Sequence, residues 1–299
     1  MPTLSGNVKD YSGGSNVARV LRIYRLSDGE YFGDTLSDAV TGNWSKDVPD
    51  YTEYFVIRHD AQRGANYSSR VLGLHCTGFD GTKDFIEVTG KKVTTIGSIA
   101  ISTSQHPAVS GVLSSAYANG SASLLSIEDS TDFDFGTGDL TIKGRFLFSS
   151  HSTIQTLIGN YKDSTTGFAL QCRSDTNTIR LTNGDAALID VSWTPSNNVW
   201  YEIEASRHAG LLRIRVDGTT VGSPVANTTN ISGSTNPMLV GGLYLASFIQ
   251  SFNGYFSEIE IHNECINLTD YTVSSDQFQH AIGNLISDNA LTYDRLIPI

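Results

Sequence analysis

Apolar and polar residues alternate along most of this chain, in short runs that end at Gly, Asn or Asp. A period of two residues is typical of a strand with one buried face, and turn residues at the ends of such strands favour hairpins. No window keeps apolar residues at helical spacing over three turns. The pattern therefore predicts an all-β protein in which any helix is short.

Two hairpins stand out in this pattern. In "LLRIRVDGTTVGS" the aliphatic residues alternate with Arg213 and Arg215, and Asp217-Gly218 supplies the positive-φ residues of a tight turn. In "YRLSDGEYF" the pair Asp28-Gly29 separates two further strand-like runs. Both segments are predicted to form antiparallel pairs, with the aliphatic face of the first one buried.

The strand-like runs fall into two groups. Residues 3–60 carry a compact set, and residues 71–265 carry ten to a dozen more, which is a number typical of a sandwich. In "FSEIEIHNE" the alternation places Ile259 and Ile261 on the inward face. We expect the other face of that strand, with Glu258, Glu260 and His262, to be solvated.

Composition narrows the class of function. Only 17% of the 299 residues are charged, and the formal net charge of −11 would repel nucleic acid and anionic membranes. No secretory signal and no apolar stretch long enough for a membrane helix are visible, so a soluble chain made in the cytosol is expected. Cys76, Cys172 and Cys265 lack metal-ligand spacing and are predicted to be buried free thiols.

Several motifs in the second group occur in a recognisable order. They are "VLGLHCTGFDGTKDF", "STDFDFGTGDLTIKGRFLF", "VWYEIEASRHAGLLRIRVDGTT" and "FNGYFSEIEI". Over residues 71–270 the chain resembles the concanavalin A-like, laminin-G-like lectin modules that are frequent in bacteriophage structural proteins. The resemblance implies a large jelly-roll sandwich. It departs from the usual pattern after "GDLTI", where the family often has a Trp and this chain has "KGRF".

The first group resembles a different module, the small transthyretin-like or carboxypeptidase-regulatory-like sandwich of the immunoglobulin type. In that module a final strand follows one like "YFVIRHD", whereas here the lectin-like segment follows it. The missing strand is predicted to be "NALTYDRLIPI" at the end of the sequence. The expected map is a discontinuous anchoring domain of residues 1–68 and 287–299, a lectin domain of residues 71–270 and a linker of residues 271–286.

The two resemblances together imply a non-enzymatic bacteriophage virion protein of the tail fibre, the baseplate or a capsid decoration. Its expected partners are other virion proteins, further copies of itself and host-surface carbohydrate, and its expected location is the virion. Many copies would strengthen a weak glycan contact. A purely structural adaptor without a ligand is the first alternative, and a glycan depolymerase using Glu258 and Glu260 is the second.

A sugar site needs an exposed aromatic ring beside planar polar groups. Loop positions of that kind are Tyr161, Asp163, Asn183, Asp185, Trp193 and Tyr244. Trp200, at the head of a strand, is predicted to belong to the core instead.

The acidic segment "EDSTDFDFGTGD" offers a further kind of chemistry. Its oxygen ligands at Asp129, Asp132, Asp134 and Asp139 could accept Ca²⁺. The spacing of an EF-hand loop is absent, and the two Phe residues are equally suited to burial. No metal ligand set and no cofactor are therefore predicted, and calcium stays an open alternative.

Overall fold

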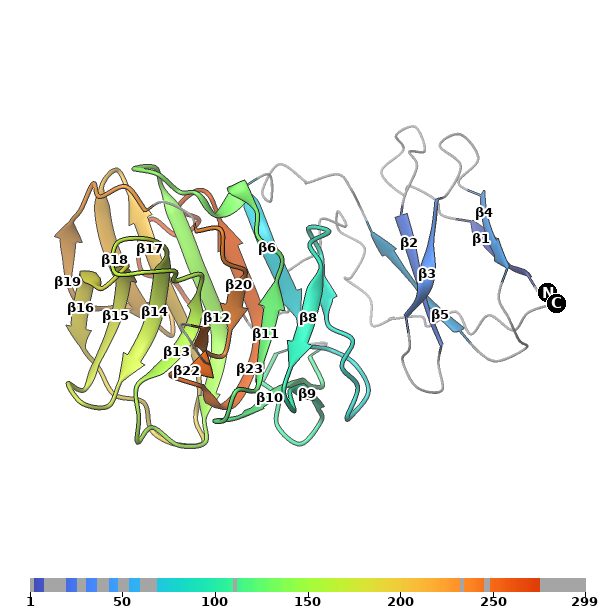
Figure 1. Cartoon of the computed structure of the whole chain (residues 1–299), viewed down its shortest axis with the longest axis horizontal. Coiled ribbons are helices and arrows are strands. Elements are labelled where there is room, and N and C mark those ends of the chain that lie inside the picture. Colours follow the sequence, from blue (N-terminus) through green and yellow to red (C-terminus); the bar gives the residue numbers. More distant parts are fainter. Residues whose placement is uncertain are drawn as a thin grey trace. The chain divides into compact units, whose positions relative to one another are not determined.

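The computed structural model describes residues 3–7, 20–25, 31–36, 43–47, 54–59, 69–109, 112–231, 234–244 and 248–274. The chain divides into two compact units (Figure 1). The smaller unit comprises residues 1–68 and 279–299, and the larger unit comprises residues 69–278.

The described part of the smaller unit consists of strands alone. They are β1 (Thr3–Asn7), β2 (Val20–Arg25), β3 (Tyr31–Leu36), β4 (Asn43–Asp47) and β5 (Tyr54–His59). β1 pairs antiparallel with β4, and β2 lies between β3 and β5. The pairing of β2 with β3 confirms the hairpin expected around Asp28-Gly29. The strand predicted in "NALTYDRLIPI" lies outside the described residues, and its pairing stays a prediction.

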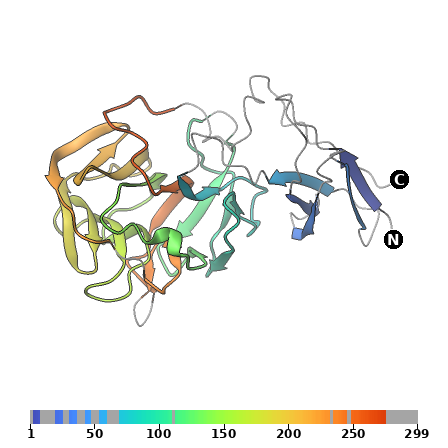
Figure 2. The ribbon, with the colours of Figure 1, turned by 90° about the horizontal axis from the view of Figure 1, so that it is seen from above.

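The larger unit contains two large antiparallel sheets, which confirms the all-β prediction (Figures 1 and 2). The nine-stranded sheet has the order β19-β18-β17-β12-β23-β10-β9, and β6 joins it by pairing with β23 and β7. Its strands are β6 (Arg70–His75), β7 (Ile86–Glu87), β9 (Ala100–Ser102), β10 (Ser115–Asn119), β12 (Leu140–Phe148), β17 (Trp200–His208), β18 (Leu211–Val216), β19 (Thr219–Ala226) and β23 (Asn253–His262).

The seven-stranded sheet has the order β16-β15-β14-β13-β20-β11-β8. Its strands are β8 (Val93–Ile96), β11 (Leu124–Ile127), β13 (Gln155–Gly159), β14 (Phe168–Arg173), β15 (Thr178–Asn183), β16 (Ala186–Ser192) and β20 (Met238–Val240). A two-residue ladder joins β21 (Leu243–Tyr244) to β22 (Phe248–Ile249). The helical part of the described chain is one 3₁₀ turn, Thr131–Phe133. The structure describes more strands here than the sequence predicted, because several have only two to four residues.

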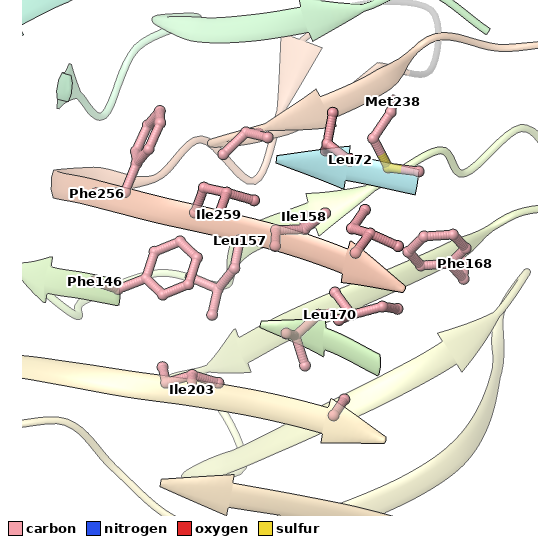
Figure 3. Packing of buried hydrophobic residues seen from close by; sticks show 14 of the residues in the cluster. Leu72, Phe146, Leu157, Ile158, Phe168, Leu170, Ile203, Met238, Phe256 and Ile259 are labelled. Atoms are coloured by element: carbon pink, nitrogen blue, oxygen red, sulfur yellow. The ribbon is translucent and has the colours of Figure 1, made fainter. Parts of the chain in front are cut away.

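The inward faces of the two sheets form one apolar core. Phe146, Ile203 and Ile259 come from the nine-stranded sheet, and Leu157 and Phe168 come from the other; all five are fully buried (Figure 3). Burying an aliphatic or aromatic side chain of this size contributes about 1.5–3 kcal/mol. The alternation read from the sequence therefore places the core-facing residues correctly, including Ile259 and Ile261.

The hairpin of β18 and β19 confirms the turn predicted at Asp217-Gly218, where φ is 50° and 75°. Two successive positive-φ residues define the tight turn that matches the twist of paired strands. The aliphatic face of β18 is buried as expected. Arg215, which points to the other face, is buried as well, so this strand is covered on both sides.

A bulge in β23 organises the middle of the nine-stranded sheet. The register of β12 against β23 shifts between Lys143 and Arg145, and Glu258 has a φ of 53°. Gly144 lies opposite the bulge, where an added Cβ would approach the Ile259 side chain to 2.4 Å. Before the bulge β23 pairs with β10, and after it β23 pairs with β6. The bulge thus marks the point at which one strand changes partners.

After β23 the chain runs across the outward face of this same sheet. Thr141 Oγ donates to the carbonyl of Glu264, the N–H of Tyr271 donates to the carbonyl of Gly218, and Arg145 donates to the carbonyl of Ser274. We call residues 263–274 the covering segment. Residues 271–274, which the sequence placed in a linker, are therefore bound to the larger unit.

The three cysteines are free thiols, as predicted. Cys76 and Cys172 are fully buried, and burial raises the pKa of both well above its ordinary value. Cys265, in the covering segment, is only half-buried. Among the described residues there is no helix long and apolar enough to cross a membrane.

Candidate functional site

Four of the six predicted sugar-site residues come together at one end of the sandwich. Tyr161 and Asp163 lie in the loop between β13 and β14, Asn183 ends β15, and Asp185 lies in the turn after it. We call the segment 160–167 with residues 183–185 the loop site. The sequence predicted these residues separately, and the strand order brings them together.

The loop site is held by contacts between backbones. The N–H of Gly184 donates to the carbonyl of Gly167 at 2.6 Å, and the N–H of Asp185 donates to the carbonyl of Ser164 at 3.0 Å. Gly184 has a φ of 53°, and a Cβ there would lie 2.3 Å from the Ser164 oxygen. The close approach of the two loops therefore requires glycine at this position.

Tyr161 and Asp185 are joined by a hydrogen bond. The Tyr161 hydroxyl donates to Asp185 Oδ1 at 2.7 Å. Partial burial, together with that bond to a carboxylate, raises the pKa of Tyr161 to about 12. Asp163 instead accepts from the N–H and hydroxyl of Thr165, both at 2.9 Å, which lowers the pKa of its carboxyl. The result is a half-buried ring fixed beside an exposed carboxylate.

Two asparagines of the loop site, Asn160 and Asn183, flank Phe168. Asn160 Oδ1 accepts from the N–H of Phe168, and Asn183 Nδ2 donates to the carbonyl of Asn230 at 3.3 Å. Asn160 Nδ2 and Asn183 Oδ1 are both buried and have no hydrogen-bond partner within the described part of the chain. Leaving a buried polar group unpaired costs about 1–3 kcal/mol. Within the described residues, one donor, Asn160 Nδ2, and one acceptor, Asn183 Oδ1, therefore remain without a partner at this end of the sandwich.

Arg207 binds the backbone of the neighbouring loops, and it was not predicted from the sequence. Its guanidinium is fully buried and donates to the carbonyls of Gly136, Gly138 and Thr229 at 2.6–2.7 Å. Burial lowers the pKa of Arg207. The available signal was its place in β17, where the alternation that buries Ile203 puts an arginine at an inward position near the end of the strand.

Trp193 and Tyr244 do not join the loop site. Trp193 packs edge-on against Phe148 and Tyr201, with ring centroids 6.3 Å and 5.1 Å apart, at the margin of the core. Tyr244 lies on β21 and is 47% exposed. The prediction that Trp200 belongs to the core is wrong. Trp200 is half-buried and pairs with Leu147 on the outward face, whereas Tyr201 packs on the core.

The outward face of β23 corrects a second prediction. Glu258, Glu260 and His262 were expected to be solvated, and they are 3%, 3% and 1% exposed. Glu258 Oε1 lies 2.9 Å from His75 Nδ1. The face is covered because side chains of the neighbouring strands, Arg70, His75 and Lys143, lie against these carboxylates. The alternation of a single strand does not report such neighbours.

Glu260 is surrounded by two cations, Arg70 and Lys143, and by the ring of His262. Arg70 donates to it at 2.8 Å, His262 lies 3.1 Å away and the Lys143 ammonium lies 3.4 Å away. Burial alone raises the pKa of Glu260, but the charge of Lys143, the bond from His262 and the charge of Arg70 outweigh it and hold the pKa well below its ordinary value. Burial lowers the pKa of Lys143, and the surrounding carboxylates outweigh it and raise that pKa.

The buried ion pairs continue from Glu260 toward β18. Glu204 accepts from Arg215 at 2.6 Å, Glu202 pairs with Arg145 at 3.2 Å, and the Tyr271 hydroxyl donates toward both carboxylates at 2.9 Å. We call this set of buried ion pairs the charged network. Catalysis by Glu258 and Glu260 would require a polysaccharide to reach both carboxylates. Each is only 3% exposed and is paired within the protein, which argues against the depolymerase alternative.

The acidic loop does not converge on a cation site. Asp132 pairs with Lys91 at 2.7 Å, and Asp139 accepts from the N–H of Ala209 at 2.8 Å and lies 2.7 Å from His208. Asp134 is exposed. Among the described residues, no three His, Cys, Asp or Glu side chains are grouped as metal ligands would be. The two Phe residues of this loop, Phe133 and Phe135, are buried as predicted.

Comparison with known families identifies the larger unit. Residues 119–285, more than half of the chain, match the family model of the Concanavalin A-like lectin/glucanases superfamily. A comparison with curated protein sequences gives no match.

Solved structures resemble the larger unit at low identity. The binding domain of Paraclostridial Mosquitocidal Protein 1 has a TM-score of 0.50 and 12% identity, covering 67% of this chain and 50% of its own. Domain 4 of AbnA, a GH43 extracellular arabinanase of Geobacillus stearothermophilus solved with arabinotriose, has a TM-score of 0.48 and 16% identity, covering 65% and 93%. A structure of botulinum neurotoxin type C, whose cell entry depends on two ganglioside molecules, has a TM-score of 0.47 and 14% identity, covering 66% and 48%. This chain spans about half the length of the two toxin structures, and the likeness concerns the fold alone.

Proposed function

The chain belongs to the Concanavalin A-like lectin/glucanases superfamily, and we propose that its larger unit is a carbohydrate-binding module without catalytic activity. The observation that carries the proposal is the loop site. There Tyr161, Asp163, Asn183 and Asp185, chosen from the sequence as sugar-contacting types, lie on two loops that touch through their backbones.

The loop site supplies the two kinds of contact that a sugar needs. The ring of Tyr161 offers an apolar surface for the C–H face of a sugar, and its hydrogen bond to Asp185 fixes the direction of the hydroxyl. The carboxylate of Asp185 is exposed and can accept from sugar hydroxyl groups. A single site of this size binds weakly, so its effect depends on many copies acting together.

The finer proposal is that the protein is part of a bacteriophage virion, where the smaller unit anchors the chain and the larger unit meets host-surface glycans. The support is the order of motifs in residues 3–60 and 71–270, together with the final "NALTYDRLIPI". A homo-oligomer on the particle would present several loop sites at once. Mass spectrometry of purified particles tests the location, and absence of the protein from them would contradict it.

Binding itself is tested on a glycan array with the purified full chain. We expect binding that falls about tenfold or more when Tyr161→Ala and Asp185→Ala are combined, because ring and carboxylate act on the same ligand. Tyr244→Ala is the control, since it removes a tyrosine that lies on β21, outside the loop site. The far-ultraviolet circular dichroism of both variants shows whether the sandwich remains folded.

A structural adaptor without a ligand is the second candidate. It is favoured by the fact that Asp163 and the Tyr161 hydroxyl already have hydrogen-bond partners within the protein. Failure of the unmodified chain to bind any glycan on the array, at millimolar sugar and with calcium present, would favour this adaptor and contradict the carbohydrate proposal.

A further inference from the structure

We propose that the nine-stranded sheet carries a second carbohydrate-binding surface, centred on Tyr117 and Tyr255, that takes internal units of a neutral, linear glycan. The inference rests on the proposed function only for the class of ligand. Its residues lie on strands of the other sheet and share none with the loop site.

The two tyrosines form one aromatic surface. Tyr117 on β10 pairs directly with Tyr255 on β23, so their side chains leave the same face of the sheet at the same level. Their ring centroids are 4.8 Å apart and the ring planes differ by 36°. Tyr117 is 38% exposed and Tyr255 is partly exposed. Paired tyrosine rings left accessible on a sheet are a surface on which a sugar ring can pack.

The Tyr255 hydroxyl is held from one side. Ser104 donates to it at 3.2 Å, and Ser104 in turn lies 2.8 Å from the hydroxyl of Ser102. These contacts come from the end of β9 and the residues that follow it, and β9 pairs with β10 beside Tyr117. The ring of Tyr255 is thus oriented before any ligand arrives, which lowers the entropy lost on binding.

Polar side chains border the tyrosine pair in both directions along the strands. Two residues away on one side lie Asn119 and Asn253, which pair with each other, and two residues away on the other side lie Ser115 and Ser257. Side chains two residues apart on a strand share a face. The Ser257 hydroxyl is fully buried and has no partner in the part of the chain that the structure describes. Both serines are fully buried and lie beneath the surface, so its accessible part consists of the two tyrosine rings and the amides of Asn119 and Asn253.

The tyrosine pair and the asparagine pair carry no charge, although the chain as a whole has a formal net charge of −11. An anionic polysaccharide or a basic peptide would find no complementary charge among these four side chains. Amides and hydroxyls beside aromatic rings instead match the hydroxyl groups and C–H faces of neutral sugars. A second copy of the chain is the competing occupant, but a stable interface buries about 800 Å² per partner and concentrates apolar residues at its centre.

The shape of the surface indicates which part of a glycan it meets. It lies across neighbouring strands of a sheet rather than between loops, so a chain can lie across it with both ends free. We therefore assign it to internal units of a linear chain, and the loop site, built from two touching turns, can meet a branch or an end.

The test is a titration of the full chain, labelled with ¹³C at the tyrosine rings, with cellohexaose, laminarihexaose and an oligogalacturonate of the same length. We expect one of the neutral hexasaccharides to shift the signals of Tyr117 and Tyr255. Tyr117→Ala should weaken that affinity about tenfold, and Tyr117→Phe should leave it within about threefold because the ring is kept. Tyr244→Ala, which removes an exposed tyrosine of β21 outside both surfaces, should leave it unchanged.

Four results would overturn the assignment. They are a lack of binding by both neutral hexasaccharides, equal binding by the oligogalacturonate, loss of all sugar binding with Tyr161→Ala alone, and concentration-dependent self-association that Tyr117→Ala abolishes. The third would leave the loop site as the sole sugar site, and the fourth would assign the tyrosine pair to a contact between copies. If Tyr117→Ala loses hexasaccharide binding but still binds the glycan array normally, this surface and the loop site are separate.

Discussion

The outward face of the nine-stranded sheet divides into a charged half and an uncharged half. From the bulge at Glu258 onward, β23 and its neighbours carry the charged network, whose members pair with each other and with the covering segment. Before the bulge, the same strand carries Tyr255, which pairs with Tyr117, and it carries no charge. One face of one sheet thus contains a part closed by its own contacts and a part left open.

The difference separates scaffold from available surface. Buried charges must be matched within the protein, because an unpaired one costs several kcal/mol. Each carboxylate of the charged network therefore has its partner already, and a ligand could replace that partner only at a large cost. A tyrosine pair bordered by amides contains no buried charge and needs no such partner. The proposed sugar surface lies in this open half, where a ligand would not have to break an ion pair.

The largest expected effect comes from breaking the closed half. Arg215→Met removes the cation that holds Glu204, both fully buried, and leaves that carboxylate unmatched. We expect the free energy of unfolding of the larger unit to fall by about 3–5 kcal/mol. Tyr117→Ala, in the open half, should cost less than about 1 kcal/mol.

Urea unfolding measures both changes. Fluorescence of Trp193 and Trp200 follows the larger unit when Trp44 is replaced by Phe, because Trp44 lies in the smaller unit. If Arg215→Met and Tyr117→Ala destabilise the larger unit equally, the distinction between the two halves is wrong. The double change Arg215→Met with Glu204→Leu should restore part of the loss, since neither charge then remains.

The second expectation concerns pH. The pKa of Glu260 is held below its ordinary value in the folded protein, so its carboxylate stabilises the fold fully at pH values well above the unfolded value of about 4.3. That contribution is lost as the pH falls below 4.3 toward the folded pKa. We expect the urea midpoint of the larger unit to drop between pH 7 and pH 3.5.

Glu260→Gln supplies the control for this pH effect. The variant should be less stable at pH 7, because Arg70 and Lys143 lose a charged partner, and its stability should depend less on pH over the same range. Asp129→Asn, at an exposed carboxylate, should keep the full dependence. An unchanged pH dependence in Glu260→Gln would show that the charged network is not the source of acid sensitivity.

The faces of the strands could be predicted from the sequence, but their burial could not. Alternation placed Ile259 inward and Glu260 outward correctly, since that depends on a local period of two. Whether the outward face meets water depends on side chains of neighbouring strands, such as Arg70 and Lys143 beside Glu260, and on the return of residues 263–274 over β12 and β17. No local pattern encodes either. The same holds for Arg215, which reads as a surface residue and is fully buried.

The sites divide in the same way. Tyr161 and Asp185 could be chosen from the sequence because each lies in a turn-rich segment with polar neighbours. Their hydrogen bond depends on the order of β13, β14 and β15 in the sheet. The pairing of Tyr117 with Tyr255 was missed, because it joins strands far apart in the chain. The type of each residue can be read from the local sequence, whereas the meeting of distant side chains depends on the order of the strands.

The third expectation tests how the covering segment closes the charged half. The Tyr271 hydroxyl donates toward Glu202 and Glu204, and burial together with these carboxylates raises its pKa well above the ordinary value. Tyr271→Phe keeps the ring and removes the donor, so we expect a loss of about 1.5–3 kcal/mol in the urea unfolding of the larger unit. Tyr244→Phe, whose ring is 47% exposed, should change the same measurement by less than about 0.5 kcal/mol. Equal effects would mean that the segment covers the network without stabilising it.

The smallest expected effect compares one hydroxyl from each half. Ser257 lies in the open half, fully buried with its Oγ unpaired, whereas Thr141 lies in the closed half and both donates to the carbonyl of Glu264 and accepts from the N–H of Ile266. Ser257→Ala removes a polar group that has no partner, so the free energy of unfolding should stay within about 0.5 kcal/mol or rise. Thr141→Val leaves two groups unpaired and should lower it by about 1–2 kcal/mol. If Ser257→Ala is the more harmful change, its hydroxyl has a structural partner.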